Sequence, residues 1–434
     1  MTTALCAPSR ASLLIGKYGH QSGFTRNGNK LAVSQLTFPK VLQSAGYQTA
    51  IIGKWHQGTQ PQGFDYYSVL NGQGRYWAAP FLETGHPWPG GKNVKNKNEG
   101  GRGGSSDKSV IVHKGYLTDV ITDLSIEWLE KRDRSKPFCL LVHHKASHVP
   151  HTYPEKYKSL FTENLPYPDT FDDDWAGREP LSKEGEAFSK FISIRGDLNG
   201  DELGEKKRMD KSDPEAYKKW AYQIFMKGYY RLVTCLDENV GRLLDHLDKA
   251  GLSENTLVVY TSDNGFFIGD HGLYNKMWMY EEALRLPLLV RLPGRIQSGS
   301  VCKSLVSMID FAATFADYAG APMPAEFQGQ SIRPLLEGKP QEPGREVRYY
   351  HYYGQYGVPA HCGIRTQTHK LICFYEEKGG PVWELYDLTK DPDEIHNLAG
   401  NPEQGSVLNS MKKKLFETMK SYGDPLAKQM GASD

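Results

Sequence analysis

Reactive polar side chains follow several short apolar segments of this 434-residue chain. The set holds a thiol, three cations, two imidazoles, a carboxylate and an amide: Cys6, Arg10, Lys54, His56, His148, Asp263, Asn264 and Lys276. Cations and imidazoles gathered in one place suit the binding and cleavage of an oxyanion ester of sulfur or phosphorus. The residue types therefore indicate chemistry on an anionic ester.

The apolar segments that position these side chains predict buried strands. Four of them are short and continuous, at residues 49–52, 138–142, 257–260 and 286–290. Runs of this kind suit strands that are buried on both faces, as in a parallel sheet. Ligands bind at the carboxyl ends of such strands, so we expect the polar residues to converge there.

Amphipathic helical patterns lie between the predicted strands. Residues 117–128 and 232–247 place their apolar side chains on one face, and the second pattern stops at Gly251. This alternation predicts an α/β fold in which helices flank a large mixed, mostly parallel sheet.

The last quarter of the chain has a different pattern. Tyrosines cluster at 349–353, short strand-like runs follow, and a helical pattern spans 407–422. These features predict a small antiparallel α+β unit. We expect a catalytic α/β domain over residues 1–330 and an α+β subdomain over residues 331–434.

The charge balance argues against nucleic acid as a partner. Lys and Arg number 52 and Asp and Glu number 51, so the chain has no global field that would attract a polyanion. The six cysteines form no C-x-x-C pair, although Cys362 and Cys373 could pair across two strands. No segment is apolar enough to span a bilayer, and no signal peptide is visible.

The segment Cys-Ala-Pro-Ser-Arg at residues 6–10 resembles the signature of the type I sulfatases of the alkaline phosphatase superfamily. Similar elements follow in the same order at 53–56, 262–265 and 383–388, so the likeness covers the whole chain. Within the family, the chain is most similar to bacterial N-acetylglucosamine-6-sulfatases and arylsulfatase A-like glycan sulfatases. The resemblance implies an alkaline phosphatase-like fold and hydrolysis of sulfate monoesters on a sulfated saccharide.

The resemblance implies a modified nucleophile. A formylglycine-generating or anaerobic sulfatase-maturating enzyme would oxidise Cys6 to Cα-formylglycine. One hydroxyl of its hydrate would attack sulfur, and collapse through the other hydroxyl would release sulfate. Arg10 would hold the oxygens of the hydrate, and a helix that starts here would present positive N–H dipoles.

The other polar residues receive roles from the same resemblance. Lys54 and Lys276 would neutralise sulfate oxygens, and His56 would assist the collapse of the hydrate as a base. His148 would face the leaving oxygen, where a proton donor helps most. The alternatives to His148 in its segment are His143, His144 and His151.

Asp263 and Asn264 would hold a calcium ion, or alternatively magnesium, through oxygen. The family has two further aspartate ligands and a strand before its signature, and neither has a counterpart in residues 1–5. We therefore expect an N-terminally truncated sulfatase that lacks its first, central strand. Ser147 also stands where the family usually has proline.

Substrate contacts are expected from loops, with His271, His361 and Arg365 as the candidates. Two other hypotheses remain open: a phosphonate or phosphate ester hydrolase of the same superfamily, and an inactive truncated fragment. The family's glycan-active members are commonly periplasmic or secreted, so we expect that location.

Overall fold

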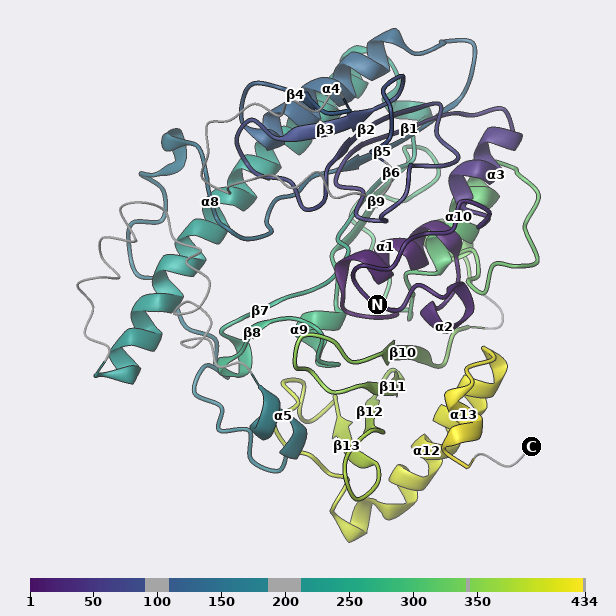
Figure 1. Ribbon diagram of the computed structural model, residues 1–434. Coiled ribbons are helices and arrows are strands. Elements are labelled where there is room, and N and C mark those ends of the chain that lie inside the picture. Colours follow the sequence, from purple (N-terminus) through teal and green to yellow (C-terminus); the bar gives the residue numbers. More distant parts are fainter. Residues whose placement is uncertain (90–108, 186–211, 341–343, 432–434) are drawn as a thin grey trace.

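The structure is a computed structural model that describes residues 1–89, 109–185, 212–340 and 344–431. Helices flank a mixed sheet, and the C-terminal part of the chain forms a separate antiparallel sheet (Figure 1). The predicted fold class is confirmed. In the described part of the chain, no helix combines the length and the hydropathy that crossing a bilayer requires.

The larger sheet has five strands in the order β4-β3-β2-β1-β5. Within it, β1 (Gln48–Gly53) pairs in parallel with β2 (Tyr66–Leu70) and β5 (Phe138–His143). The strands β3 (Pro80–Glu83) and β4 (Ile111–Val112) extend it in antiparallel fashion. The first two predicted apolar strands are thus adjacent and parallel.

The register of β1 and β5 brings two strand ends together. Gly53 lies opposite His143, and the Lys54 N–H donates to the His143 carbonyl at 2.7 Å. Gly53 has φ +105°, and a Cβ there would lie 2.1 Å from that carbonyl oxygen, so only glycine fits. The residues after both strands therefore leave the sheet at the same edge.

A second, two-stranded ladder stands apart from this sheet. Its strands β6 (Val258–Thr261) and β9 (Leu288–Arg291) pair in antiparallel fashion. The expectation of a parallel strand at 286–290 is therefore wrong. Between them the chain forms only the short strands β7 (Phe267–Ile268) and β8 (Tyr274–Asn275) and two short helical turns at 270–272 and 281–284, whereas a parallel return needs a long crossover.

A cavity of about 1210 Å³ separates β5 from β6. Apolar side chains from both strands and from the helices above and below form much of its wall, among them Leu141, Val259 and Phe311. Among the described residues, β5 pairs only with β1, and β6 pairs only with β9. The sheet is interrupted between the strand ends that carry His143 and Asp263.

Helices cover both faces of the five-stranded sheet (Figure 1). One face carries α1 (Cys6–Ile15), α3 (Phe38–Ser44) and α10 (Asp310–Tyr318), and the other carries α4 (Leu117–Lys131) and α8 (Pro214–Lys249). Alternation along β1 sends Ile51 to the first group and Ile52 to the second. Both predicted helices are confirmed, although α8 begins earlier, where the Asp213 side chain caps it by accepting from the Ala216 N–H.

Short helical elements connect these parts: α2 (Gly19–Ser22), η1 (Glu155–Tyr157), α5 (Glu179–Glu184), η2 (Ser253–Asn255), η3 (Asp270–Gly272), α9 (Glu281–Leu284), α11 (Arg333–Leu336) and η4 (Pro402–Gln404).

The C-terminal sheet is antiparallel throughout, as predicted. It comprises β10 (Arg348–Tyr352), β11 (His361–Arg365), β12 (His369–Phe374) and β13 (Val382–Asp387), with α12 (Gly405–Ser421) and α13 (Leu426–Gln429) behind it. Cys362 and Cys373 face each other across β11 and β12 as free, buried thiols.

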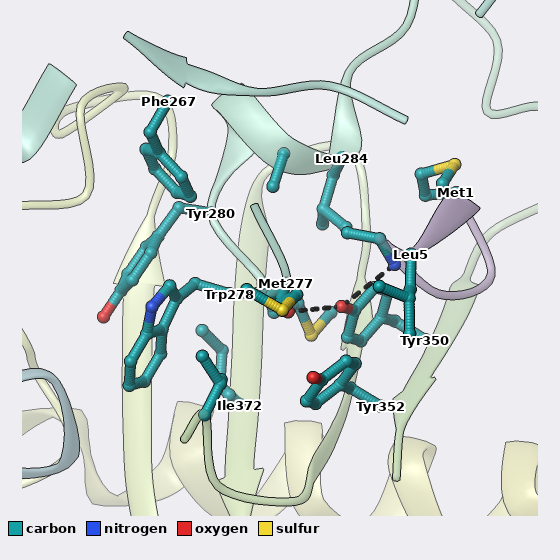
Figure 2. Close-up of a cluster of buried hydrophobic side chains, with 14 of the residues drawn as sticks. Met1, Leu5, Phe267, Met277, Trp278, Tyr280, Leu284, Tyr350, Tyr352 and Ile372 are labelled. Carbon is teal, nitrogen blue, oxygen red and sulfur yellow. Dashed lines mark hydrogen bonds between the residues drawn. The ribbon is translucent and has the colours of Figure 1, made fainter. Parts of the chain in front are cut away.

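A buried cluster joins the first residues of the chain to the C-terminal sheet (Figure 2). Met1 and Leu5 pack within it. The Tyr350 hydroxyl accepts from the Ala4 N–H at 3.1 Å and donates to the Met277 carbonyl at 2.6 Å. The position of the backbone that leads into Cys6 is therefore fixed by residues that lie far away in the sequence.

Candidate active site

Cys6 is the first residue of α1, and only 2% of its surface is exposed. The preceding Leu5 is extended, so the thiol sits at the amino end of the helix, where unpaired N–H groups create a positive potential. Two buried amides hold the next residue. Asn27 Oδ1 accepts from the Ala7 N–H at 3.2 Å, and Gln57 Nε2 donates to the Ala7 carbonyl at 3.0 Å.

Two ammonium groups determine the charge of this thiol. Lys276 Nζ lies 2.9 Å from Cys6 Sγ. Burial alone raises the pKa of Cys6, but the charges of Lys276 and Lys54 lower it. Hydrogen bonding with the imidazoles of His148 and His56 lowers the pKa further, so that it falls well below its usual value. The site therefore stabilises an anion at this position.

A cationic corner surrounds Asp263. Arg10 Nε donates to Asp263 Oδ2 at 2.6 Å, and Lys54 Nζ lies 3.9 Å from the same oxygen. Lys276 Nζ donates to Asn264 Oδ1 at 3.0 Å. Burial raises the pKa of Asp263, but Arg10, Lys54 and Lys276 outweigh it and hold the pKa well below its usual range. The carboxylate thus stays ionised although it is enclosed.

His148 presents one ring nitrogen to the site. Its Nδ1–H donates to the Val149 carbonyl at 2.7 Å, which leaves Nε2 as an acceptor in the neutral ring. Burial lowers the pKa of His148 to about 4, so the ring is neutral near pH 7. The other three histidines of this segment have other partners. His143 contacts Arg10 and the Lys54 carbonyl, His144 contacts Thr122, and His151 contacts the Phe225 carbonyl.

His56 follows β1 by three residues and has φ 59°. Its Nε2 atom is 3.4 Å from Gln73 Nε2. His56 Nδ1 and Gln73 Oε1 are both buried and have no hydrogen-bond partner among the described residues. Buried polar atoms are normally hydrogen-bonded, so a bound ligand can supply the partner that these two atoms lack.

The structure does not bring the three predicted substrate contacts to Cys6. His271 is fully buried, and its Nδ1 lies 2.8 Å from Asp173 Oδ2. His361 is also fully buried and stacks on Tyr350. Arg365 is half-buried on β11, where its Nε lies 3.6 Å from Glu281 Oε1. Carboxylate and aromatic partners enclose these side chains, so none of them presents a free surface to a substrate at this site.

Three residues near the nucleophile were missed in the sequence. Asn27 and Gln57 hold Ala7, and Gln73 contacts His56. Gln57 directly follows the Lys-Trp-His element, which is a signal that sequence reading could have used. Asn27 and Gln73 lie in turns rich in Gly and Asn, whose composition gives no such signal.

The described residues do not complete a site for a divalent cation. Asp263 and Asn264 offer oxygens of the right type, but Asp263 Oδ2 and Asn264 Oδ1 already accept from cationic side chains. Calcium usually takes six to eight oxygen ligands. Within the described ranges, the single group of three His, Cys, Asp or Glu ligand atoms near one another is His20, His351 and Asp424, none of which belongs to this site.

Family comparison covers nearly the whole chain. Residues 1–321 match the family described as Sulfatase, and residues 269–421 match N-sulphoglucosamine sulphohydrolase, C-terminal. The chain is 39% identical to the N-acetylglucosamine-6-O-sulfatase of Bacteroides thetaiotaomicron, over 97% of this chain and 79% of that one. It is 27% identical to the N-acetylglucosamine-6-sulfatase of Homo sapiens, over 100% of this chain and 79% of that one.

Solved structures support the assignment to the sulfatase family. One was determined in complex with its substrate, D-glucosamine-2-N,6-O-disulfate, and matches with a TM-score of 0.87 at 38% identity. The match covers 98% of this chain and 90% of the other. A putative sulfatase from Bacteroides fragilis, at 21% identity and a TM-score of 0.75, shares the fold.

Proposed function

This chain belongs to the sulfatase family and is a sulfuric ester hydrolase, and we propose that it removes sulfate from a sulfated glucosamine of a glycan. The substrate class is supported by the relatives, two of which are named as N-acetylglucosamine-6-sulfatases. One structural relative was solved with a disulfated glucosamine as its substrate. The 6-O-sulfate is therefore the position we propose for cleavage.

The observation that carries the mechanism is the setting of Cys6. It lies at a helix amino end with Lys276 Nζ at 2.9 Å and two imidazoles beside it. Formylglycine at this position would supply, as its hydrate, a hydroxyl nucleophile and a route for releasing sulfate. A formylglycine-generating or anaerobic maturation enzyme is the partner that this modification requires.

The surrounding side chains would hold the charge of the ester. Lys276 and Lys54 would pair with sulfate oxygens, since both already stabilise an anion at Cys6. Arg10 is fixed by Asp263 and the Lys54 carbonyl, so it would orient the nucleophile without reorganising. Bound sulfate beside His148 would raise the pKa of its imidazole and favour the protonated form that donates to the leaving oxygen.

We propose calcium, with magnesium as the alternative, as the cation that Asp263 and Asn264 would help to hold. Their two oxygens are too few for a tight site, and no catalytic step is assigned to the ion. A periplasmic or secreted location is proposed from the family alone. The division at residue 330 into a catalytic domain and a C-terminal subdomain is likewise a proposal.

The test uses chain produced together with a maturation enzyme. Its intact mass should show the loss expected when the CH2SH group of Cys6 becomes CHO. The modified protein should release sulfate from glucosamine-6-sulfate and N-acetylglucosamine-6-sulfate, and Cys6→Ala should abolish this release. Faster turnover of the matching phosphate esters would favour the phosphate or phosphonate hydrolase hypothesis. Full activity with unmodified Cys6 would overturn the nucleophile.

A further inference from the structure

The turn that follows β2 contacts both histidines of the site, His56 through its ring and His148 through its backbone. Gln73 Nε2 lies 3.4 Å from His56 Nε2, and the Tyr76 hydroxyl donates to the His148 carbonyl at 2.6 Å. Tyr76 is 3% exposed and stacks on Tyr116, so this part of the turn is anchored in the protein core. The amide of Gln73 is therefore carried by a segment with a fixed position relative to Cys6.

Gln73 offers both kinds of hydrogen-bonding group to one ring nitrogen. Its Oε1 atom is buried and has no partner among the described residues, while its Nε2 faces the His56 ring. A neutral imidazole that is to take up a proton at Nδ1 carries its hydrogen on Nε2. An imidazolium carries hydrogens on both nitrogens, so Nε2–H needs an acceptor opposite it in both states. Rotation of the amide by half a turn presents Oε1 in that place.

The charges around His56 make a neutral partner useful. Lys276 and Lys54 are the cationic groups that act on Cys6, and His148 is the other imidazole beside it. Two nearby ammonium groups disfavour an imidazolium. A carboxylate in place of Gln73 would offset them and hold His56 in its charged form, in which it cannot act as a base. A neutral amide can form a hydrogen bond with the His56 ring without favouring the charged form of the ring.

We propose that Gln73 is a positioning residue that holds the His56 ring toward Cys6 in both the neutral and the protonated state. This inference rests on the proposed function, because it concerns the proton transfers of that reaction. It gives the unpartnered Gln73 Oε1 a role: the oxygen accepts from His56 Nε2–H, which leaves Nδ1 as the nitrogen that takes up the proton.

Three variants of the formylglycine-bearing enzyme test the proposal. Gln73→Met keeps the volume and removes both hydrogen-bonding groups, so kcat should fall about tenfold with KM nearly unchanged. Gln73→Glu should move the acidic limb of the kcat profile to higher pH, because a carboxylate opposite the ring favours its charged form. The control is Gln367→Glu, an exposed amide bound to the Lys303 carbonyl, which should change neither. A wild-type kcat and pH profile in both Gln73 variants would overturn the proposal.

A measurement without turnover separates this inference from the proposed function. Cys6→Ala protein labelled with ¹⁵N-histidine reports the protonation of the His56 ring nitrogens, assigned by their loss in Cys6→Ala/His56→Asn. The His56 titration should move to higher pH when Gln73→Glu is added. An unchanged titration would overturn the role of Gln73, whether or not the enzyme releases sulfate. A wild-type enzyme that fails to release sulfate while His56 still responds to Gln73→Glu would contradict the proposed function alone.

Discussion

Lys276 Nζ lies 2.9 Å from Cys6 Sγ, although 270 positions separate the two residues in the chain. The same ammonium group donates to Asn264 Oδ1 at 3.0 Å, so it links the nucleophile to the turn after β6. Charge-assisted contacts of this length are stronger than neutral ones. Lys276 thus connects the amino end of α1 to the turn after β6.

Replacing Lys276 by Met should slow alkylation of unmodified Cys6 by iodoacetamide at pH 7 by about tenfold, because the thiolate loses its nearest cation. Peptide mapping follows Cys6 separately from the exposed Cys302. The matched control is Lys249→Met, at the far end of α8, which should leave the rate unchanged. Equal rates in the wild type and Lys276→Met would show that Lys276 does not stabilise the thiolate.

Replacing Arg10 by Met should cost about 3–5 kcal/mol in the free energy of unfolding, because it leaves Asp263 charged and enclosed. The two side chains are 12% and 16% exposed. Urea denaturation measures the change. As a control, Arg242→Met removes a partner of Asp123 at the surface, where both side chains are largely exposed, and should cost no more than about 1 kcal/mol. Similar losses in both variants would contradict this account.

The cavity between β5 and β6 should bind an apolar dye such as 8-anilinonaphthalene-1-sulfonate (ANS) to the folded chain. Apolar side chains such as Leu141, Val259 and Phe311 line much of this space of about 1210 Å³, which is partly open to solvent. An apolar dye can therefore displace the water that the space holds. Fluorescence titration with near-ultraviolet circular dichroism checks that binding occurs in the folded state.

Calcium should not raise the melting temperature of this 434-residue chain, because its two predicted ligands, Asp263 and Asn264, already bind Arg10 and Lys276 and are too few for a calcium site. Differential scanning calorimetry with and without calcium tests this prediction, and ANS fluorescence tests the preceding one. A sharp melt that shifts upward with calcium, in protein that does not bind ANS, would show that the residues of this chain complete the core and the metal site.

The stability that Asp424 contributes should disappear in acid. Burial raises its pKa, but hydrogen bonds with His20 and His351 outweigh this and hold the pKa well below its usual value of about 3.9. A depressed folded-state pKa adds stability above the unfolded pKa, and this stability is lost as pH falls through the folded pKa. Urea midpoints of the wild type and Asp424→Asn should therefore differ at pH 6, and the difference should begin to shrink below about pH 4. A constant difference would contradict the linkage.

Much of the fold was predictable because local patterns carry it. The apolar runs at β1, β5 and β6 and the amphipathic faces of α4 and α8 are periodic in the sequence, and the structure places them as strands and helices. The direction of β9 was not predictable, since an apolar strand looks the same in either orientation. Nor did the pattern show that the β6–β9 ladder stands apart from the larger sheet across a cavity.

The site was predictable in part for a related reason. Cys6, Lys54, His56, His148 and Lys276 lie together, and their catalytic roles stay predictions. A side chain's partners cannot be read from its neighbours in the chain. The three substrate candidates, His271, His361 and Arg365, were chosen by residue type and loop position, and each has a partner from another segment.

The sequence by itself determined the chemistry, because the Cys-Ala-Pro-Ser-Arg segment and the cations that accompany it define what reaction the residues can perform. Only the tertiary structure decided which groups lie close enough to form hydrogen bonds or to shift one another's pKa. Electrostatic and hydrogen-bonding effects act over a few ångströms, so the lowered pKa of Cys6 depends on Lys276 and Lys54 arriving from distant segments. The same short range makes Gln73, which the sequence pattern left unmarked, the partner of His56.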